Sequence, residues 1–303
     1  AENWTANLEK NKTRTDTHEL GLLMYIPFGH GYRLTQDDRY ANILMESAIT
    51  QVKRFDPDVA GIKSFDWLPE KFPMAIDALM SLEILFWAAK NGGDRELYNM
   101  AVRHAETNMR QIIREDGSTY HMLYFDDETG EIERKDTFQG FGPETTWARG
   151  QAWAIYAFTF CFRETGDDRF LRAAQKVADY YIRRLPEDHV PYWDFDAPDS
   201  LLVKESSASA ITASALLQLT ELCKDNDRKQ LYHDAALKML RSLSSEKYLA
   251  QETKSSAILQ HSVGHLPKDM EIDVGFTFAD YYYIEALLLY FKLNESIVNE
   301  KEA

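Results

Sequence analysis

The sequence has little cysteine, an excess of acidic over basic residues and no long hydrophobic run. Its 303 residues include two cysteines, Cys161 and Cys223, which are too few for a disulfide framework or a cysteine zinc site. Both lie in apolar stretches with helical periodicity, which predicts two buried thiols. The 34 basic and 49 acidic residues give a net charge of −15, which argues against a general nucleic-acid binder.

Several motifs of common enzyme classes are also missing. The sequence has no phosphate-binding loop, no glycine-rich dinucleotide fingerprint and no Gly-x-Ser-x-Gly elbow of a serine hydrolase. Its histidines lack metal-ligand spacing, and His104 and His233 are expected on solvated helix faces beside acidic neighbours. No run of about 18 apolar residues predicts a transmembrane helix. We therefore expect no metal, no organic cofactor and no membrane partner.

The composition is that of a folded globular chain, with 45% hydrophobic and 13% aromatic residues. Apolar residues recur at spacings of three and four, which predicts a mainly helical fold. Residues 119–125 and 131–138 are the exceptions, because they read as two short strands around a turn at 126–130. The predicted helices span 2–10, 20–34, 37–55, 72–91, 94–114, 146–166, 168–185, 206–223, 227–245 and 276–293.

A weak internal repeat organises these helices. Four of them open with a short polar turn that contains Asp followed by Arg, at Arg39, Arg95, Arg169 and Arg228. The Asp can accept hydrogen bonds from the free N–H groups of the first helical turn. The distance along the chain between successive Asp-Arg turns is that of two helices with their connections. The repeating unit is therefore a helical hairpin. We expect a single all-α domain over residues 1–303, a toroid of stacked hairpins, because no linker divides the chain.

Two features of the sequence point to chemistry. Asp77 lies within the apolar stretch 73–80, where a carboxylate is costly unless it is paired or used. Burial raises the pKa of a carboxyl group, as a general acid near neutral pH requires, although an Asp that caps a helix end remains the alternative. In the segment 146–153, Arg149 and Trp153 share one helix face. A guanidinium beside an aromatic ring suits a sugar acid, which stacks on the ring and pairs its carboxylate with Arg.

These motifs resemble those of the unsaturated glucuronyl hydrolases, glycoside hydrolase family 88. The resemblance is carried by the stretches 147–156, 118–126, 192–195, 206–213 and 279–287, which span most of the chain. It implies an (α/α)6 toroid, in agreement with the hairpin repeat, and a bacterial enzyme of the cytoplasm or periplasm. The family normally has one more hairpin before the first motif. Since that hairpin is absent and the chain does not begin with Met, we expect the N-terminus to be incomplete.

The resemblance also implies a substrate and a mechanism. The substrate is an unsaturated uronyl di- or oligosaccharide, a polysaccharide lyase product of glycosaminoglycans or similar polymers. An Asp protonates C4 of the C4=C5 double bond, water adds at C5, and the hemiketal opens to release the partner sugar. Asp77 matches this acid, and Glu19 stands where a second carboxylate, usually Asp, contacts the sugar. The positions matching the binding residues are His18, Phe65, His121, Gln139, Arg149 and Trp153.

Two departures leave other interpretations open. Glu19 is one methylene longer than the usual Asp, and Phe65 stands where a stacking Trp is common, with Trp67 close by. Glu19 and the missing hairpin make a non-catalytic carbohydrate-binding toroid one alternative. An unsaturated rhamnogalacturonyl hydrolase is another, although Gln151 after Arg149-Gly150 favours the glucuronyl enzymes, since the other group typically has Asn there. A helical interaction scaffold would have no need for Asp77 beside a sugar-acid pocket. Sulfation preference, linkage preference and oligomeric state stay undetermined.

Overall fold

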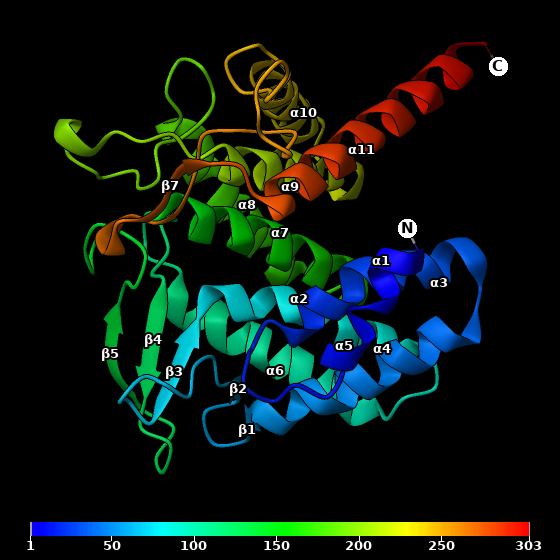
Figure 1. Cartoon of the computed structure of the whole chain (residues 1–303), viewed down its shortest axis with the longest axis vertical. Helices are drawn as coiled ribbons and strands as arrows, with labels where there is room; N and C mark the ends of the chain where they lie inside the picture. The colour runs from blue at the N-terminus through cyan, green and yellow to red at the C-terminus, as the bar shows by residue number, and fades with distance from the viewer. Residues whose placement is uncertain (1, 303) are drawn as a thin grey trace. The chain divides into compact units, whose positions relative to one another are not determined.

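The computed structural model describes the backbone of residues 2–302 and the side chains of residues 2–294. Contacts within the chain divide it into two compact units (Figure 1), and each is described by itself. Unit 1 comprises Ala1–Ile112, Met122–Asp136 and Glu164–Gly166. Unit 2 comprises Ile113–His121, Thr137–Arg163 and Asp167–Ala303. In the part that the structure describes, no helix combines the length and the apolar character needed to cross a membrane.

Unit 1 combines helices with two small antiparallel sheets. The strand order of the larger sheet is β3-β4-β5, and β1 pairs with β2. All four residues of β3 and of β4 are buried, so these two strands form part of the core. The elements are α1 Glu2–Ala6, η1 Glu9–Asn11, α2 Leu20–Met24, the π-helix η2 Tyr25–Gly29, α3 His30–Thr35, α4 Asp38–Gln51, η3 Val52–Arg54, β1 Phe55–Asp56, β2 Gly61–Ile62, β3 Phe72–Ala75, η4 Ile76–Ser81, α5 Leu82–Lys90, α6 Arg95–Ile112, β4 Met122–Phe125 and β5 Ile132–Asp136.

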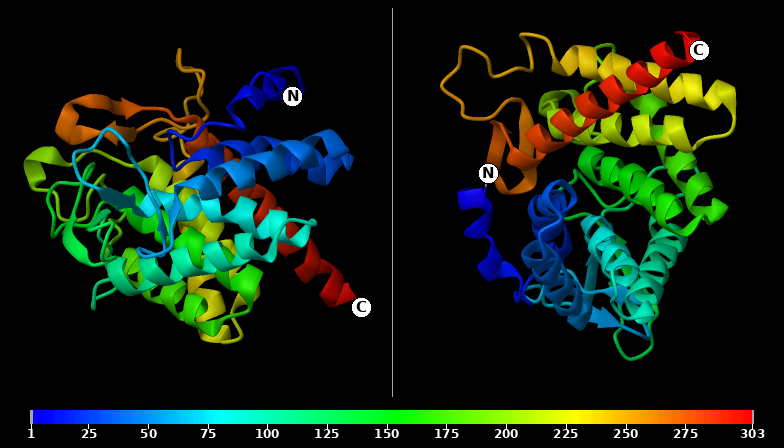
Figure 2. Two further views of the ribbon diagram at one scale, coloured as in Figure 1. Left: turned by 90° about the horizontal axis from the view of Figure 1, so that it is seen from below. Right: turned by 90° about the vertical axis from the view of Figure 1, so that its right-hand side faces the viewer.

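Unit 2 is built from long helices and one two-stranded sheet. Helix α9 contacts both α10 and α11 (Figure 2), and fourteen of its residues are buried, which makes it the centre of this unit. Strands β6 and β7 pair antiparallel around the short helix η6. The elements are α7 Ala148–Thr165, whose last two residues fall in unit 1, α8 Asp168–Arg184, η5 Asp199–Leu201, α9 Ser206–Leu222, α10 Asn226–Leu243, β6 Ser262–His265, η6 Leu266–Lys268, β7 Met270–Val274 and α11 Thr277–Glu302.

The predicted helix starts are confirmed in detail. The carboxylates of Asp37, Asp167 and Asp225 each accept a hydrogen bond from backbone N–H groups of the next helical turn, at α4, α8 and α10. Asp94 does the same for Glu96 at the start of α6. The polar turns therefore cap the second helix of each hairpin, as the repeat indicated.

Two expectations about local structure are wrong. Residues 72–91 do not form one helix, because β3 and the 3-10 helix η4 precede α5. His104 does not face solvent: it is fully buried, and its Nδ1 accepts a hydrogen bond from Ile62 N at 3.0 Å. Burial lowers the pKa of His104 to about 3, which keeps the ring neutral in the core. The prediction of two buried free thiols, Cys161 and Cys223, is confirmed.

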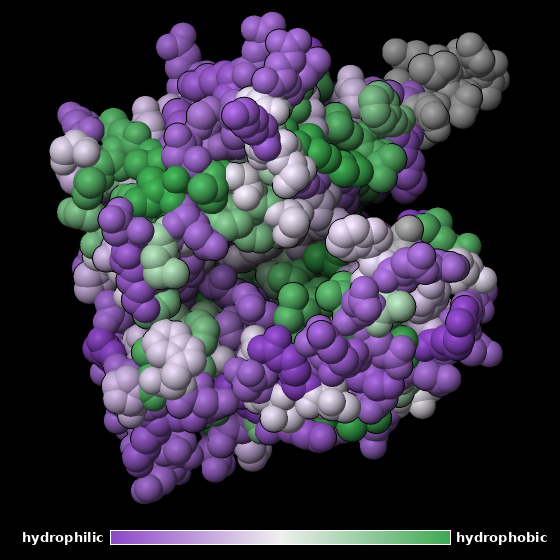
Figure 3. All heavy atoms as spheres, viewed as in Figure 1, coloured by the Kyte–Doolittle hydropathy of each residue, from purple (hydrophilic) through white to green (hydrophobic). Residues whose placement is uncertain are grey.

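Helix α11 presents apolar side chains to solvent as well as to its neighbours. Ile284, Leu288 and Phe291 are 44%, 64% and 57% exposed, and their spacing places them on one face. Figure 3 shows apolar side chains gathered over this helix. By contrast, Ala279 and Ala286 are fully buried on the same helix. The described part of α11 is therefore apolar on more than one face.

Candidate functional site

Asp77 lies at the start of η4, directly after the buried strand β3. Its neighbours Ile76 and Ala78 are fully buried, while Asp77 itself is partly exposed. The end of β3 is fixed by a hydrogen bond from Ala75 N to the Ser64 hydroxyl, at 2.8 Å. The backbone changes from extended to 3-10 at Ala75 and Ile76, and the Asp77 side chain that follows is partly buried, with its Oδ2 atom inaccessible to solvent. This placement agrees with an acid that is in use.

His18 lies at the N-terminal side of α2, and its side chain is buried against the loop that carries Phe65. The ring centroids of His18 and Phe65 lie 4.9 Å apart in an edge-on arrangement. His18 Nδ1 lies 3.0 Å from the carbonyl oxygen of Ser64. Because a carbonyl oxygen only accepts, Nδ1 carries the hydrogen of this bond. The Nε2 atom of His18 is buried and has no hydrogen-bond partner among the described residues.

Neutral polar groups tie the His18 turn to η4. The His18 carbonyl oxygen accepts hydrogen bonds from Ser81 Oγ at 2.6 Å and from Gln51 Nε2 at 2.9 Å. A Cβ atom at Gly21 would come within 2.4 Å of the Ser81 carbonyl oxygen, so only glycine permits this approach of α2 to η4. The Ser81 hydroxyl thus joins the turn that carries His18 to η4, the segment that carries Asp77.

Glu19 and Trp67 complete the candidate residues of unit 1. Glu19 precedes α2 and is exposed, and its side chain makes no capping hydrogen bond to the helix. Trp67 is 59% exposed, and its ring centroid lies 5.2 Å from that of Phe65. Unit 1 therefore brings together His18 and Phe65, with Glu19 next to His18 in the chain and Asp77 on the segment bonded to it.

His121 anchors the loop that carries Gln139 in unit 2. Its Nδ1 accepts hydrogen bonds from the backbone N–H groups of Phe138 and Gln139, each at 3.2 Å. Since backbone N–H groups only donate, the ring hydrogen lies on Nε2, the reverse of the arrangement in His18. The ring stacks on Trp147 with 4.2 Å between centroids. His121 thus presents an N–H donor at Nε2.

Gln139 and Arg149 converge on one carbonyl group of strand β6. Gln139 Nε2 donates to the Gly264 oxygen at 2.7 Å, and Arg149 Nη2 donates to the same oxygen at 3.1 Å. Arg149 Nη1 also donates to the Val263 oxygen at 2.6 Å. The guanidinium lies 4.5 Å from the ring centroid of Trp147. Three of the predicted site residues of unit 2, His121, Gln139 and Arg149, are therefore brought together around Trp147 and β6.

Glu205 is a residue of this site that sequence analysis missed. Its side chain is fully buried and forms an ion pair with Arg149 at 2.9 Å, and it also accepts from Val263 N at 3.1 Å. Burial raises the pKa of Glu205, and the Arg149 guanidinium opposes that change. The carboxylate therefore sets the position of Arg149 and of the start of β6. It also compensates part of the positive charge that Arg149 could offer to an anion.

Trp153 and His265 carry buried nitrogen atoms without a hydrogen-bond partner in the described part of the chain. They are Nε1 of Trp153, whose residue is 4% exposed, and both ring nitrogens of His265. The Trp153 ring packs edge-on against Tyr282 at 5.4 Å, and the His265 ring packs edge-on against Phe138 at 4.6 Å. Buried polar groups are normally satisfied by protein, water or ligand, so each of these atoms has room for one further hydrogen bond. Within the described residues, no group of three metal-ligating side chains occurs.

Comparison with known proteins identifies the family. The sequence model of the family described as Glycosyl Hydrolase Family 88 matches residues 2–287. The chain belongs to this family. An unsaturated glucuronyl hydrolase of Formosa agariphila is 40% identical over 294 residues, which are 95% of this chain and 72% of that protein. An unsaturated chondroitin disaccharide hydrolase of Streptococcus pneumoniae is 31% identical, over 93% of this chain and 72% of its own.

Solved structures of family 88 agree with the predicted fold class. A crystal structure of an unsaturated glucuronyl hydrolase specific for heparin has a TM-score of 0.92 and 38% identity, and the match covers 96% of this chain and 79% of the other. The enzyme of Bacillus sp. GL1 has a TM-score of 0.88 and 32% identity, covering 94% and 78%. The prediction of an all-α, (α/α)6-type fold is confirmed, and so is the enzyme class, a glycoside hydrolase.

Proposed function

We propose that this chain hydrolyses oligosaccharides that carry a 4,5-unsaturated uronic acid at the non-reducing end. The relatives named above are unsaturated glucuronyl and unsaturated chondroitin disaccharide hydrolases, and one streptococcal family structure is complexed with dGlcA-GalNAc6S. The observation that carries the proposal is that two residues expected to bind sugar also have a buried ring nitrogen with no hydrogen-bond partner among the described residues. His18 Nε2 and Trp153 Nε1 are buried without a partner in the described residues, and both belong to residues whose motif positions imply sugar binding. A sugar hydroxyl or ring oxygen at either residue would supply the hydrogen bond that its nitrogen lacks.

The proposed reaction begins with proton transfer from the Asp77 carboxyl group to C4 of the double bond. A water molecule then adds its oxygen at C5, and its proton returns to the Asp77 carboxylate. The resulting hemiketal opens and releases the partner sugar. Only the C4=C5 bond is hydrated directly, so the reaction differs from ordinary glycoside hydrolysis by two carboxylates at a fixed separation. Glu19, next to His18, supplies a second carboxylate for the sugar hydroxyls.

The residues of unit 2 fit the uronate carboxylate in this proposal. The His121 Nε2–H group and the Arg149 guanidinium are donors, and a carboxylate accepts several such bonds. Glu205 holds Arg149 in an ion pair, so recognition depends on the direction of these donors more than on net positive charge. We propose that residues 1–303 act together as one catalytic domain.

The test is loss of the ultraviolet absorbance of the conjugated double bond when the protein is incubated with lyase-derived unsaturated disaccharides. We expect the wild type to remove the absorbance, and Asp77→Asn to turn over roughly 10²–10⁴-fold more slowly. Glu83→Gln, a carboxylate on the following helix α5, is the matched control and should leave turnover unchanged. Binding of the disaccharide without loss of absorbance by the wild type would support a non-catalytic binding protein instead.

A further inference from the structure

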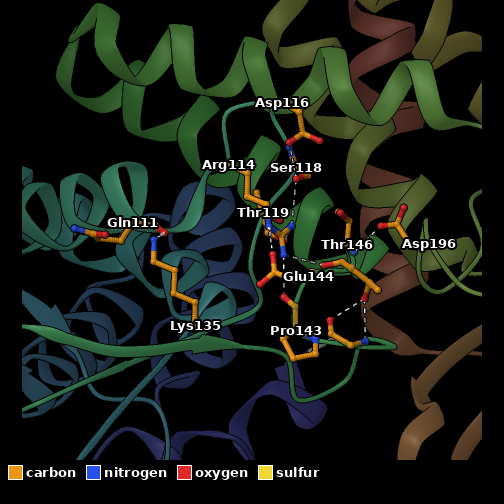
Figure 4. A network of polar contacts seen from close by, with 12 residues as sticks. Gln111, Arg114, Asp116, Ser118, Thr119, Lys135, Pro143, Glu144, Thr146 and Asp196 are labelled. Atoms are coloured by element: carbon orange, nitrogen blue, oxygen red, sulfur yellow. Dashed lines mark hydrogen bonds and ion pairs between the residues drawn. The ribbon is translucent and has the colours of Figure 1, made fainter.

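The loop of residues 137–147 carries Gln139 but contains no helix or strand of its own. Apart from backbone contacts of Thr146 and Trp147 at its end, its position therefore depends on side chains that bond to its backbone. At one end, His121 Nδ1 accepts from the N–H groups of Phe138 and Gln139. At the other end, Arg114 donates to the carbonyl oxygen of Pro143 at 3.0 Å, as Figure 4 shows. It also donates to the carbonyl oxygen of Thr145 at 3.2 Å. The middle of the loop, directly after Gln139, needs a separate anchor.

That anchor is Asp194, a residue that is 1% exposed. Its Oδ2 accepts hydrogen bonds from Phe141 N at 2.9 Å and from Thr145 Oγ1 at 2.7 Å. Its Oδ1 accepts from Asp196 N at 2.9 Å, which fixes the carboxylate to its own turn. Asp194 also pairs with Trp147 in an isolated antiparallel bridge. Three donors thus converge on one buried carboxylate. One of them, Phe141 N, lies on the loop two residues after Gln139.

We propose that Asp194 is a positioning residue, whose buried carboxylate holds the loop at Phe141 and Thr145 and thereby places the Gln139 side chain for substrate. The inference rests on the proposed function. Asp194 does not contact the Gln139 side chain in any described hydrogen bond, so it acts through the backbone. Gly140 shows how close the fit is: a Cβ atom there would lie 2.9 Å from Asp194 Oδ2 and 2.6 Å from Thr137 Oγ1.

Asp194→Asn tests the carboxylate with little change of volume. An amide has only one acceptor oxygen for three converging donors, so at least one bond of the loop or of the Asp196 turn is lost. We expect the KM for the unsaturated disaccharide to rise about tenfold while kcat changes less, because a hydrogen bond to a charged group has an effect of that order. In a Gln139→Ala background, Asp194→Asn should change KM by no more than about twofold, since its effect passes through Gln139.

Two glycines of the same loop provide a matched pair. Gly140→Ala places a methyl group against Asp194 and Thr137, and we expect it to raise KM as Asp194→Asn does. Gly142→Ala is the control, because its Cβ would meet only Thr145 Cγ2, at an ordinary 3.7 Å. This pair keeps the proposal testable if Asp194→Asn does not fold. An equal effect of both glycine substitutions would overturn it.

Amide hydrogen exchange of the peptide containing Phe141 measures how firmly the loop backbone is held, and it needs no substrate. We expect exchange in this peptide to be about tenfold faster in Asp194→Asn than in the wild type, and unchanged in Gln139→Ala. Unchanged exchange in Asp194→Asn, or a KM effect that persists in full without the Gln139 side chain, would overturn the proposal. Failure of the wild type to consume the disaccharide would instead overturn the proposed function, and the exchange result would still decide the role of Asp194.

Discussion

The site residues of unit 1 and those of unit 2 are held in place by different chemistry. At the His18 turn, the positioning groups bonded to the His18 carbonyl oxygen are neutral: the hydroxyl of Ser81 and the amide of Gln51. Around Arg149 and Gln139, they are two buried carboxylates, Glu205 and Asp194. A neutral hydrogen bond contributes about 0.5–1.5 kcal/mol, whereas removing one partner of a buried ion pair costs about 3–5 kcal/mol. Single substitutions should therefore damage the geometry of unit 2 more than that of unit 1.

The largest effect is expected for Glu205→Gln. The substitution leaves the Arg149 charge buried without its ion-pair partner, so we expect the free energy of unfolding to fall by about 3–5 kcal/mol, measured by urea denaturation at neutral pH. Glu221→Gln is the control, because Glu221 forms an exposed pair with Lys292 at 3.5 Å, and should cost less than about 1 kcal/mol. Equal losses for the two variants would contradict the contrast between the units.

A pH-dependent effect of intermediate size is expected from His104 in unit 1. Its pKa is about 3 in the folded chain and near 6.5 when unfolded, so the unfolded state binds a proton first as the pH falls. The stability that is fully present above pH 6.5 is therefore lost on acidification, by about 2 kcal/mol at pH 5. Chemical denaturation of wild type and His104→Gln at several pH values measures this loss, and the variant should show a flatter dependence. His233→Gln on α10 should keep the wild-type slope; if it flattened the curve equally, His104 would not be the source.

The smallest effect is expected for Ser81→Ala. It removes one of two hydrogen bonds to the His18 carbonyl oxygen, so the free energy of unfolding should fall by about 1 kcal/mol and kcat/KM should fall several-fold. Ser47→Ala removes an equally buried hydroxyl whose bond, to Ile43 O, stays within α4. It should leave kcat/KM unchanged. A loss for Ser81→Ala as large as that for Glu205→Gln would remove the distinction between neutral and charged positioning.

The sequence allowed prediction of those parts of the fold that depend on local signals. The Asp-Arg turns cap their helices as expected because an Asx carboxylate and the N–H groups it accepts lie within three residues. Residues 72–81 were misread because a fully buried strand followed by a 3-10 turn has the same apolar composition as a buried helix. The hairpin β6–β7 was missed for a related reason, since the short strand β6 is buried at three successive positions and lacks polar alternation.

The site residues were predicted from their positions in motifs. The residues that contact them in the folded chain could not be predicted from distances along the sequence. Glu205 precedes a helix of small residues, 56 positions from Arg149, and nothing local in the sequence shows that the two form an ion pair. Asp194 lies in the stretch 192–195, which contributes to the family resemblance without giving Asp194 a role. The structure places Trp193 and Asp194 in the core, where long-range contacts determine what each polar group does.

Gln139 enters any binding event with its nitrogen already bonded to the Gly264 oxygen. A ligand that recruits this amide must break the existing bond or leave it in place and use only the side-chain oxygen. In the first case the net gain is the difference between two hydrogen bonds of similar strength, and in the second it is that of one new bond, which requires a ligand aligned with the side-chain oxygen. In the proposed reaction, Gln139 would therefore favour a ligand that is well aligned with its side chain over one that is not.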